Sequence, residues 1–176
     1  MKILVVVDMQ NDFTSGALGN KECEGVVPKV VDIINNEEFD EIILTRDTHQ
    51  SNYLETQEGK KLPVEHCIKD TDGWQIRDEI MSAVGDKKHS IIDKSTFGSI
   101  YLAMALNCVL DEEKKNYDIT LVGVCTGICV ISNALLLKAY FPEAKINVRA
   151  DACACVTPES HKTALEAMKM CQINII

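Results

Sequence analysis

The segment from residue 121 to residue 130 joins a wholly apolar run to a Gly-x-x-Thr turn and a cysteine, Cys129. The cysteine stands where the apolar periodicity that follows predicts the start of a helix. At that place a thiol faces unpaired backbone N–H groups, which favour the thiolate and could receive an oxyanion. Cys129 is thus a candidate nucleophile, although a cysteine at a tight turn can also be a small buried apolar side chain.

Other reactive side chains follow the ends of the predicted strands. Asp8 follows the first apolar run, Asp47 and His49 follow the second, and Lys94 follows the third. Ligands of an open parallel sheet bind at the carboxyl ends of its strands, so we expect these groups to meet Cys129 at one edge. Asp8 could take the thiol proton as a general base and later protonate a leaving amine. Lys94 would hold the carboxylate and stabilise the thiolate.

A second group of polar side chains lies in the long polar stretch from residue 47 to residue 73. It offers one carboxylate, two imidazoles and two further oxygen donors: Asp47, His49, His66, Glu55 and Glu58. A mixed set of nitrogen and oxygen donors suits zinc, iron or manganese better than calcium or magnesium. The histidines could instead cap strand ends or bond backbone carbonyls, so a divalent metal site is one of two interpretations.

Hydrophobic periodicity predicts the elements that position these groups. Apolar runs predict six strands, at residues 3–7, 41–45, 90–93, 119–124, 145–149 and 172–176. Helical spacing of apolar residues predicts helices at 26–34, 74–84, 100–110, 128–140 and 159–170. Several strands are apolar on both faces, which is typical of a parallel sheet covered on each side. We therefore expect a single α/β domain over residues 1–176, with three α/β/α layers around a six-stranded parallel sheet.

Composition excludes several classes of function. The formal net charge of −9 argues against binding to nucleic acids or anionic membranes, which requires clustered Lys and Arg. The first apolar run is too short for a signal peptide or a membrane span. Eight cysteines without a Cys-x-x-Cys pair favour reduced thiols in a cytoplasmic protein.

Five segments carry a resemblance to a known family. They are Val5-Val6-Val7-Asp8-Met9-Gln10-Asn11-Asp12-Phe13, Thr45-Arg46-Asp47-x-His49, Pro63-x-x-His66-Cys67, Lys94-x-x-Phe97-Gly98-Ser99 and Gly123-x-x-Thr126-x-x-Cys129-Val130. In this order they resemble the isochorismatase-like cysteine hydrolases, and the nicotinamidase branch most closely. The resemblance implies hydrolysis of a small amide through a thioester, and nicotinamide is the best single substrate to expect.

The resemblance also implies roles for single residues. The catalytic triad would be Asp8, Lys94 and Cys129. A cis peptide between Val124 and Cys125 would aim the backbone N–H groups of Cys125 and Cys129 at the oxyanion.

The metal ligands implied by the resemblance are Asp47, His49 and His66 with one glutamate. Spacing leaves Glu55 and Glu58 open as the fourth ligand, and we favour Glu58. Aromatic walls around a planar substrate ring would come from two further side chains, Phe13 and Tyr101. No organic cofactor is expected, the only partner expected is a small-molecule amide substrate, and a homo-oligomer would be in keeping with the family.

The sequence departs from the nicotinamidase pattern at the substrate pocket. That branch commonly has an aromatic residue three positions before the second metal histidine, where this chain has Pro63, and the only tryptophan is Trp74. Hydrolysis of an N-carbamoyl amide or of a vinyl ether therefore stays open, although the vinyl-ether branch does not need a cysteine nucleophile. Outside the hydrolases, a non-catalytic thiol or redox protein is the alternative, in which Cys125 and Cys129, one helical turn apart, could react with each other.

Overall fold

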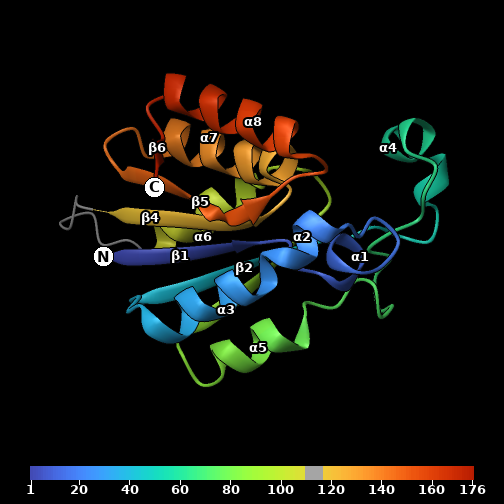
Figure 1. Cartoon of the computed structure of the whole chain (residues 1–176), viewed down its shortest axis with the longest axis horizontal. Coiled ribbons are helices and arrows are strands. Elements are labelled where there is room, and N and C mark those ends of the chain that lie inside the picture. Colours follow the sequence, from blue (N-terminus) through green and yellow to red (C-terminus); the bar gives the residue numbers. More distant parts are fainter. Residues whose placement is uncertain (110–116) are drawn as a thin grey trace.

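A six-stranded sheet organises the computed structural model, which describes residues 1–109 and 117–176 (Figure 1). Its strands lie in the order β3-β2-β1-β4-β5-β6, and all neighbouring pairs are parallel. The strands are β1 (Lys2–Val7), β2 (Glu41–Asp47), β3 (His89–Lys94), β4 (Asp118–Val124), β5 (Lys145–Ala154) and β6 (Asn174–Ile175). The predicted α/β class with a six-stranded parallel sheet is confirmed.

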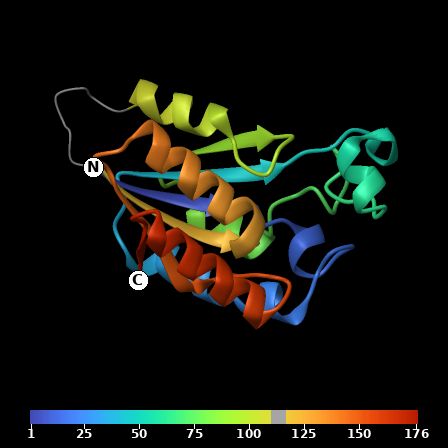
Figure 2. The same cartoon turned by 90° about the horizontal axis from the view of Figure 1, so that it is seen from above.

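Helices cover both faces of this sheet (Figures 1 and 2). One face packs on α2 (Lys21–Gly25), α3 (Val27–Asn36) and α5 (Asp78–Val84). The other packs on α6 (Ile100–Val109), α7 (Ile131–Tyr140) and α8 (Pro158–Met170). Along β1, Ile3, Val5 and Val7 enter one core while Leu4 and Val6 enter the other. This alternation explains why the central strands are apolar at every position.

Short elements project beyond the carboxyl ends of the strands (Figures 1 and 2). They are α1 (Asn11–Thr14), the 3₁₀ turn η1 (Tyr53–Glu55) and α4 (Gln57–Lys61). The last two lie inside the polar stretch that the sequence leaves without periodicity. The long loop is therefore ordered, and it stands above the edge where ligands of a parallel sheet bind.

The predicted helix at 74–84 is wrong over its first four residues. Ile76 forms an isolated antiparallel bridge with Gln10, and α5 begins only at Asp78. The N–H of Asn11 donates to the Gln75 carbonyl, and the N–H of Arg77 donates to the Met9 carbonyl. These tertiary hydrogen bonds use backbone groups that a helix start would need.

Two further boundaries differ from the predictions by more than two residues, and one falls outside the described residues. Strand β5 is predicted to end at residue 149 but continues to Ala154. The register between β4 and β5 shifts between Leu121 and Gly123 of β4, and the shift keeps the two strands paired to the end of β5. The helix predicted at 128–140 begins as a π-helical turn, η2 (Thr126–Val130), before α7. The last residue of the helix predicted at 100–110, Leu110, lies outside the described residues.

Gly123 is required where β4 passes β1. Its φ is 114°, in the region that favours glycine, and a Cβ there would collide with the Val7 carbonyl. The close approach brings the end of β1 against the turn that follows β4. Among the described residues, no helix is both long and apolar enough to span a membrane.

Candidate active site

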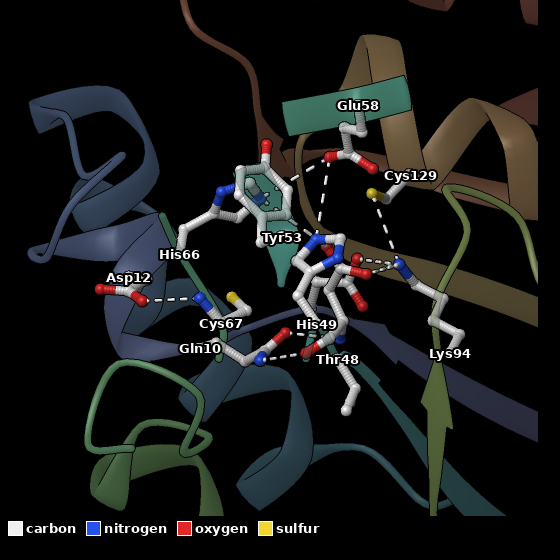
Figure 3. A network of polar contacts seen from close by, with 12 residues as sticks. Gln10, Asp12, Thr48, His49, Tyr53, Glu58, His66, Cys67, Lys94 and Cys129 are labelled. Atoms are coloured by element: carbon white, nitrogen blue, oxygen red, sulfur yellow. Dashed lines mark hydrogen bonds and ion pairs between the residues drawn. The ribbon is translucent and has the colours of Figure 1, made fainter. Parts of the chain in front are cut away.

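Lys94 is the centre of the group at the carboxyl ends of the strands (Figure 3). Its Nζ lies 2.7 Å from Asp8 Oδ2 and 3.6 Å from Cys129 Sγ. The side chains of Lys94 and Asp8 are 1% and 0% exposed. The structure thus brings together the carboxylate that follows β1, the ammonium at the end of β3 and a thiol of η2, as the strand-end pattern predicts.

Burial and charge set the protonation state of Lys94. Burial lowers the pKa of its ammonium, but the Asp8 and Asp47 carboxylates outweigh burial and hold that pKa above its usual range. Asp47 Oδ1 lies 3.5 Å from the same Nζ. Lys94 therefore carries its charge at neutral pH.

The backbone after β1 and a hydrogen bond from β2 fix the Asp8 carboxylate in position to act as a base. Its φ is 49°, and its Oδ1 accepts a hydrogen bond from the Thr45 hydroxyl at 2.7 Å. Oδ2 faces Lys94 but accepts no well-directed hydrogen bond from the described residues. Burial raises the pKa of Asp8 above its usual value, against the lowering effect of Lys94. A carboxylate with a raised pKa accepts a proton more readily.

Cys129 lies in η2, where the N–H groups of Ile128 and Val130 both donate to the Cys125 carbonyl, at 3.0 and 3.1 Å. The thiol is buried, and burial together with the Asp8 charge raises its pKa well above the usual value, while Lys94 opposes them. The sequence predicts that a helix start lowers this pKa, but in the structure the raising effect of burial is larger, and that prediction is wrong. The resting thiol keeps its proton and needs a base.

The cis peptide between Val124 and Cys125 that the family resemblance implies is confirmed. The backbone N–H groups of Cys125 and Cys129 are the oxyanion donors that the same resemblance implies. That role remains a prediction.

A second group lies beside the triad, at the base of the polar loop (Figure 3). Its four members offer one ligand atom each, all within 4.8 Å of one another: Asp47, His49, Glu58 and His66. Glu58 comes from α4, whereas Glu55 lies exposed on η1 and does not join the group. Of the two glutamates that spacing left open, the structure brings Glu58 into the group.

The distances within this group fit a metal ion. His49 Nε2 lies 3.1 Å from Asp47 Oδ2, and His66 Nε2 lies 3.7 Å from Glu58 Oε1. Two ligands bound at about 2.1 Å around a tetrahedral ion would be about 3.4 Å apart. Burial raises the pKa of Asp47, but the hydrogen bond with His49 and the Lys94 charge outweigh it and keep Asp47 ionised. Two imidazoles and two carboxylates form a donor set suited to zinc, iron or manganese.

Neighbouring groups orient the two histidines. His66 Nδ1 lies 2.8 Å from the Val64 carbonyl, which leaves Nε2 free to bind a metal. The buried Tyr53 ring packs against both imidazoles, at 4.7 Å from His49 and 5.0 Å from His66, and its hydroxyl donates to the Leu62 carbonyl.

The predicted aromatic walls lie in different surroundings. Phe13 on α1 is half-buried, with its ring 5.5 Å from that of His66. Tyr101 on α6 is 65% exposed. Trp74 is buried, donates its ring N–H to Thr48 Oγ1 and stacks on the Arg46 guanidinium at 3.4 Å. The substrate contacts of Phe13 and Tyr101 remain predictions.

Gln10 is a buried side chain to which sequence reasoning assigned no role. Its amide oxygen accepts the N–H of Asp47 at 2.7 Å, and its amide nitrogen donates to the carbonyls of Asp47 and Trp74 at 2.9 and 2.8 Å. The backbone N–H and C=O groups of Asp47 are thus both hydrogen-bonded by the side chain of Gln10, two positions after Asp8. The only hint of this role in the sequence is that Gln10 lies within the motif at residues 5–13. No spacing rule pairs residue 10 with residue 47.

Two more polar side chains hold the loops in place. Asp12 Oδ2 accepts the N–H of Cys67 at 2.8 Å, which fixes the residue after His66 (Figure 3). The buried Asn133 amide donates to the Cys129 carbonyl at 2.8 Å, and its oxygen accepts the N–H of Ser99 at 2.9 Å. This second side chain connects the loop after β3 to the nucleophile turn.

Comparison with known proteins identifies a family model and two curated relatives. The isochorismatase domain model matches residues 2–176. A nicotinamidase of Saccharomyces cerevisiae is 32% identical over 174 residues, covering 77% of this chain and 80% of the relative. A Bacillus subtilis protein described as an uncharacterized isochorismatase family protein, PncA, is 27% identical and covers 93% of this chain and 92% of its own length.

Solved structures share the fold. The pyrazinamidase of Pyrococcus horikoshii in complex with zinc is 28% identical with a TM-score of 0.79, covering 99% of this chain and 98% of that one. The yeast nicotinamidase Pnc1p has a TM-score of 0.82 and covers 100% and 99%. At 24% identity, the latter likeness supports the fold alone.

The opposing effects of Asp8 and Lys94 on the thiol can be separated by alkylation. Because the carboxylate raises the pKa of Cys129 and the ammonium lowers it, Asp8→Asn should shift the pH profile of Cys129 alkylation by iodoacetamide downward. Lys94→Met should shift the profile upward. The exposed Cys171, followed in the same digests, serves as the internal control and should react alike in all proteins. Identical Cys129 profiles in the three proteins would contradict this electrostatic account.

Proposed function

The chain belongs to the isochorismatase family of hydrolases, and on that premise we propose that it cleaves a small primary amide with Cys129 as nucleophile. Nicotinamide is the substrate proposed first, since a yeast relative of 32% identity is a nicotinamidase. The observation that carries the proposal is the buried contact of Lys94 Nζ with Asp8 Oδ2 at 2.7 Å and with Cys129 Sγ at 3.6 Å.

In the first half of the proposed reaction, Asp8 removes the proton from the Cys129 thiol. Lys94 stays charged and stabilises the thiolate, which attacks the amide carbonyl carbon. The backbone N–H groups of Cys125 and Cys129 receive the negative oxygen of the tetrahedral intermediate. Asp8 then returns its proton to the leaving nitrogen, so ammonia departs and a thioester remains.

In the second half, a water molecule takes the place of ammonia. Asp8 removes a proton from this water, whose oxygen attacks the thioester carbonyl. The carboxylic acid leaves as the Cys129 sulfur departs, and Lys94 again stabilises the thiolate until the proton returns. One carboxylate thus serves as base, acid and base again, which suits a group whose pKa is raised by burial.

We further propose that Asp47, His49, Glu58 and His66 hold one divalent metal ion. When bound, such an ion would supply Lewis-acid chemistry. The protein's own contribution is orientation: His66 is fixed by the Val64 carbonyl, and Asp47 is fixed by Gln10. A relative of 28% identity crystallised with zinc supports zinc as the first ion to test.

Ammonia release tests the proposed reaction. The wild-type protein should release ammonia from nicotinamide, and Cys129→Ala should lower kcat by about 10⁴-fold or more because no other group forms the thioester. Cys171→Ala, which removes an exposed cysteine, is the matched control and should match wild type. Equal activity of wild type and Cys129→Ala would exclude Cys129 as nucleophile. Turnover of N-carbamoyl amides without turnover of nicotinamide would replace the proposed substrate.

Metal analysis tests the second group. The purified protein should bind about one equivalent of zinc, iron or manganese, because four donors converge on one point. Glu58→Gln should weaken binding by at least about 10-fold, and His66→Ala should weaken it further. The matched control is Glu55→Gln, the same change three residues away on η1, which should leave binding unaltered. Equal losses in the two glutamate variants would remove Glu58 from the ligand set.

A further inference from the structure

Three thiols that the proposed reaction does not use lie together beside the nucleophile turn: Cys23 of α2, Cys125 and Cys155. Cys125 is the middle member, since its thiol interacts with those of both Cys23 and Cys155. Cys23 Sγ accepts a hydrogen bond from Asn20 Nδ2 at 3.3 Å and lies 3.9 Å from the Cys155 carbonyl oxygen. The group is therefore held by both α2 and the end of β5.

The sheet register brings Cys125 and Cys155 side by side. Val124 is paired with Ala154 on the neighbouring parallel strands, and the two cysteines are the next residues on each chain. Neighbouring strands lie about 4.8 Å apart, and a disulfide needs Cα atoms about 4.4–6.8 Å apart. If the strand spacing continues for one more residue, the register favours a separation of the two cysteines that suits a disulfide. Cys129, by contrast, directs its sulfur toward Lys94, so the pairing of Cys125 with Cys129 is not favoured.

Cys155 is the reactive member of this pair. The neighbouring Cys125 thiol lowers the pKa of Cys155, with smaller contributions from Ser160 and the Gly127 backbone, against the raising effect of burial. The thiolate is the form of cysteine that attacks an oxidant. The sulfur lies beneath the exposed Gly127, where an added Cβ would come within 3.4 Å of it. Cys155 itself is buried, so a small oxidant would have to reach its sulfur past Gly127, a residue without a side chain.

From this arrangement we propose that Cys125 and Cys155 form a reversible disulfide under oxidising conditions, and that this disulfide stops turnover. The oxidant is a hydroperoxide, with hydrogen peroxide as its simplest member. The site is distinct from the Asp8, Lys94 and Cys129 group.

Formation of the disulfide takes two steps. The Cys155 thiolate attacks one oxygen of hydrogen peroxide, the O–O bond breaks, and hydroxide leaves, which gives a sulfenic acid. The Cys125 sulfur then attacks the sulfenic sulfur, and its proton leaves with the sulfenic oxygen as water. Two thiols are oxidised by two electrons to one disulfide, and the peroxide is reduced to two molecules of water.

The effect on turnover rests on the proposed function. The Cys125 carbonyl accepts the N–H groups of Ile128 and Val130, so Cys125 is the anchor of the turn that carries Cys129. Its own N–H is a proposed oxyanion donor. Drawing the Cys125 sulfur from contact to bonding distance of the Cys155 sulfur would shift both groups, and the loss of one oxyanion donor lowers kcat by about 10²-fold or more.

Peptide mapping tests the disulfide without reference to activity. The Cys129→Ala variant is exposed to hydrogen peroxide, its free thiols are alkylated, and it is digested with trypsin. We expect a linked pair of peptides 116–138 and 150–162, in which Cys125 is then the only cysteine of the first. The link should disappear with dithiothreitol and should not form when Cys155→Ser is added. The proposal is overturned if no link forms. It is also overturned if the link still forms in the Cys155→Ser variant, since Cys125 would then be bonded to Cys153.

Activity measurements test the regulatory step. Peroxide should lower wild-type ammonia release by about 10²-fold, with recovery on dithiothreitol, while Cys155→Ser and Cys155→Ala should lose less than about twofold. Cys23→Ser, which removes the other neighbour of Cys125, should still form the link and respond as wild type. Equal recoverable loss in wild type and Cys155→Ser overturns regulation by this disulfide. A protein that forms the link but hydrolyses no amide refutes the proposed function and leaves the disulfide established, so the two failures are distinguishable.

Discussion

The buried ammonium of Lys94 is the interaction on which the rest of the site depends. It brings a positive charge into a place where its side chain is 1% exposed, and such a charge is costly unless it is paired. Asp8 and Asp47 supply the pairing from two neighbouring strands, at 2.7 and 3.5 Å. The fold can bury this group only because the strand ends of β1, β2 and β3 meet at one edge. The thiol of Cys129 then lies where the same charge stabilises its ionised form.

Asp47 joins two groups that look separate along the chain. One of its oxygens faces Lys94, and the other faces the imidazole of His49 at 3.1 Å. Its backbone is gripped on both sides by Gln10, which follows Asp8 by two residues. The catalytic group and the candidate metal ligands therefore share the Asp47 carboxylate and the Gln10 side chain that holds it. A substitution in either group should alter the electrostatics of the other through Asp47.

Much of this arrangement follows from local pattern, and the rest depends on tertiary contacts. The apolar runs locate the strand ends, so Asp8, Lys94 and Cys129 can be predicted to meet. Spacing alone could not choose Glu58 over Glu55, because the choice depends on how η1 and α4 fold over the histidines. The start of α5 was misplaced because the bridge between Gln10 and Ile76 outcompetes helical periodicity. The register shift in β5, which brings Cys155 beside Cys125, has no periodic signal.

The central claim is that the Lys94 ammonium can be buried only because the Asp8 and Asp47 carboxylates are buried beside it. A double-mutant cycle on the free energy of unfolding tests this claim. Lys94→Met should destabilise the protein by about 3–5 kcal/mol, since it leaves buried carboxylates without a cation. Adding Asp8→Asn to that variant should recover part of the loss, because it removes one of the unpaired charges. Denaturant titrations of wild type, both single variants and the double variant measure the four stabilities. A double variant that loses the sum of the two single losses would contradict the account.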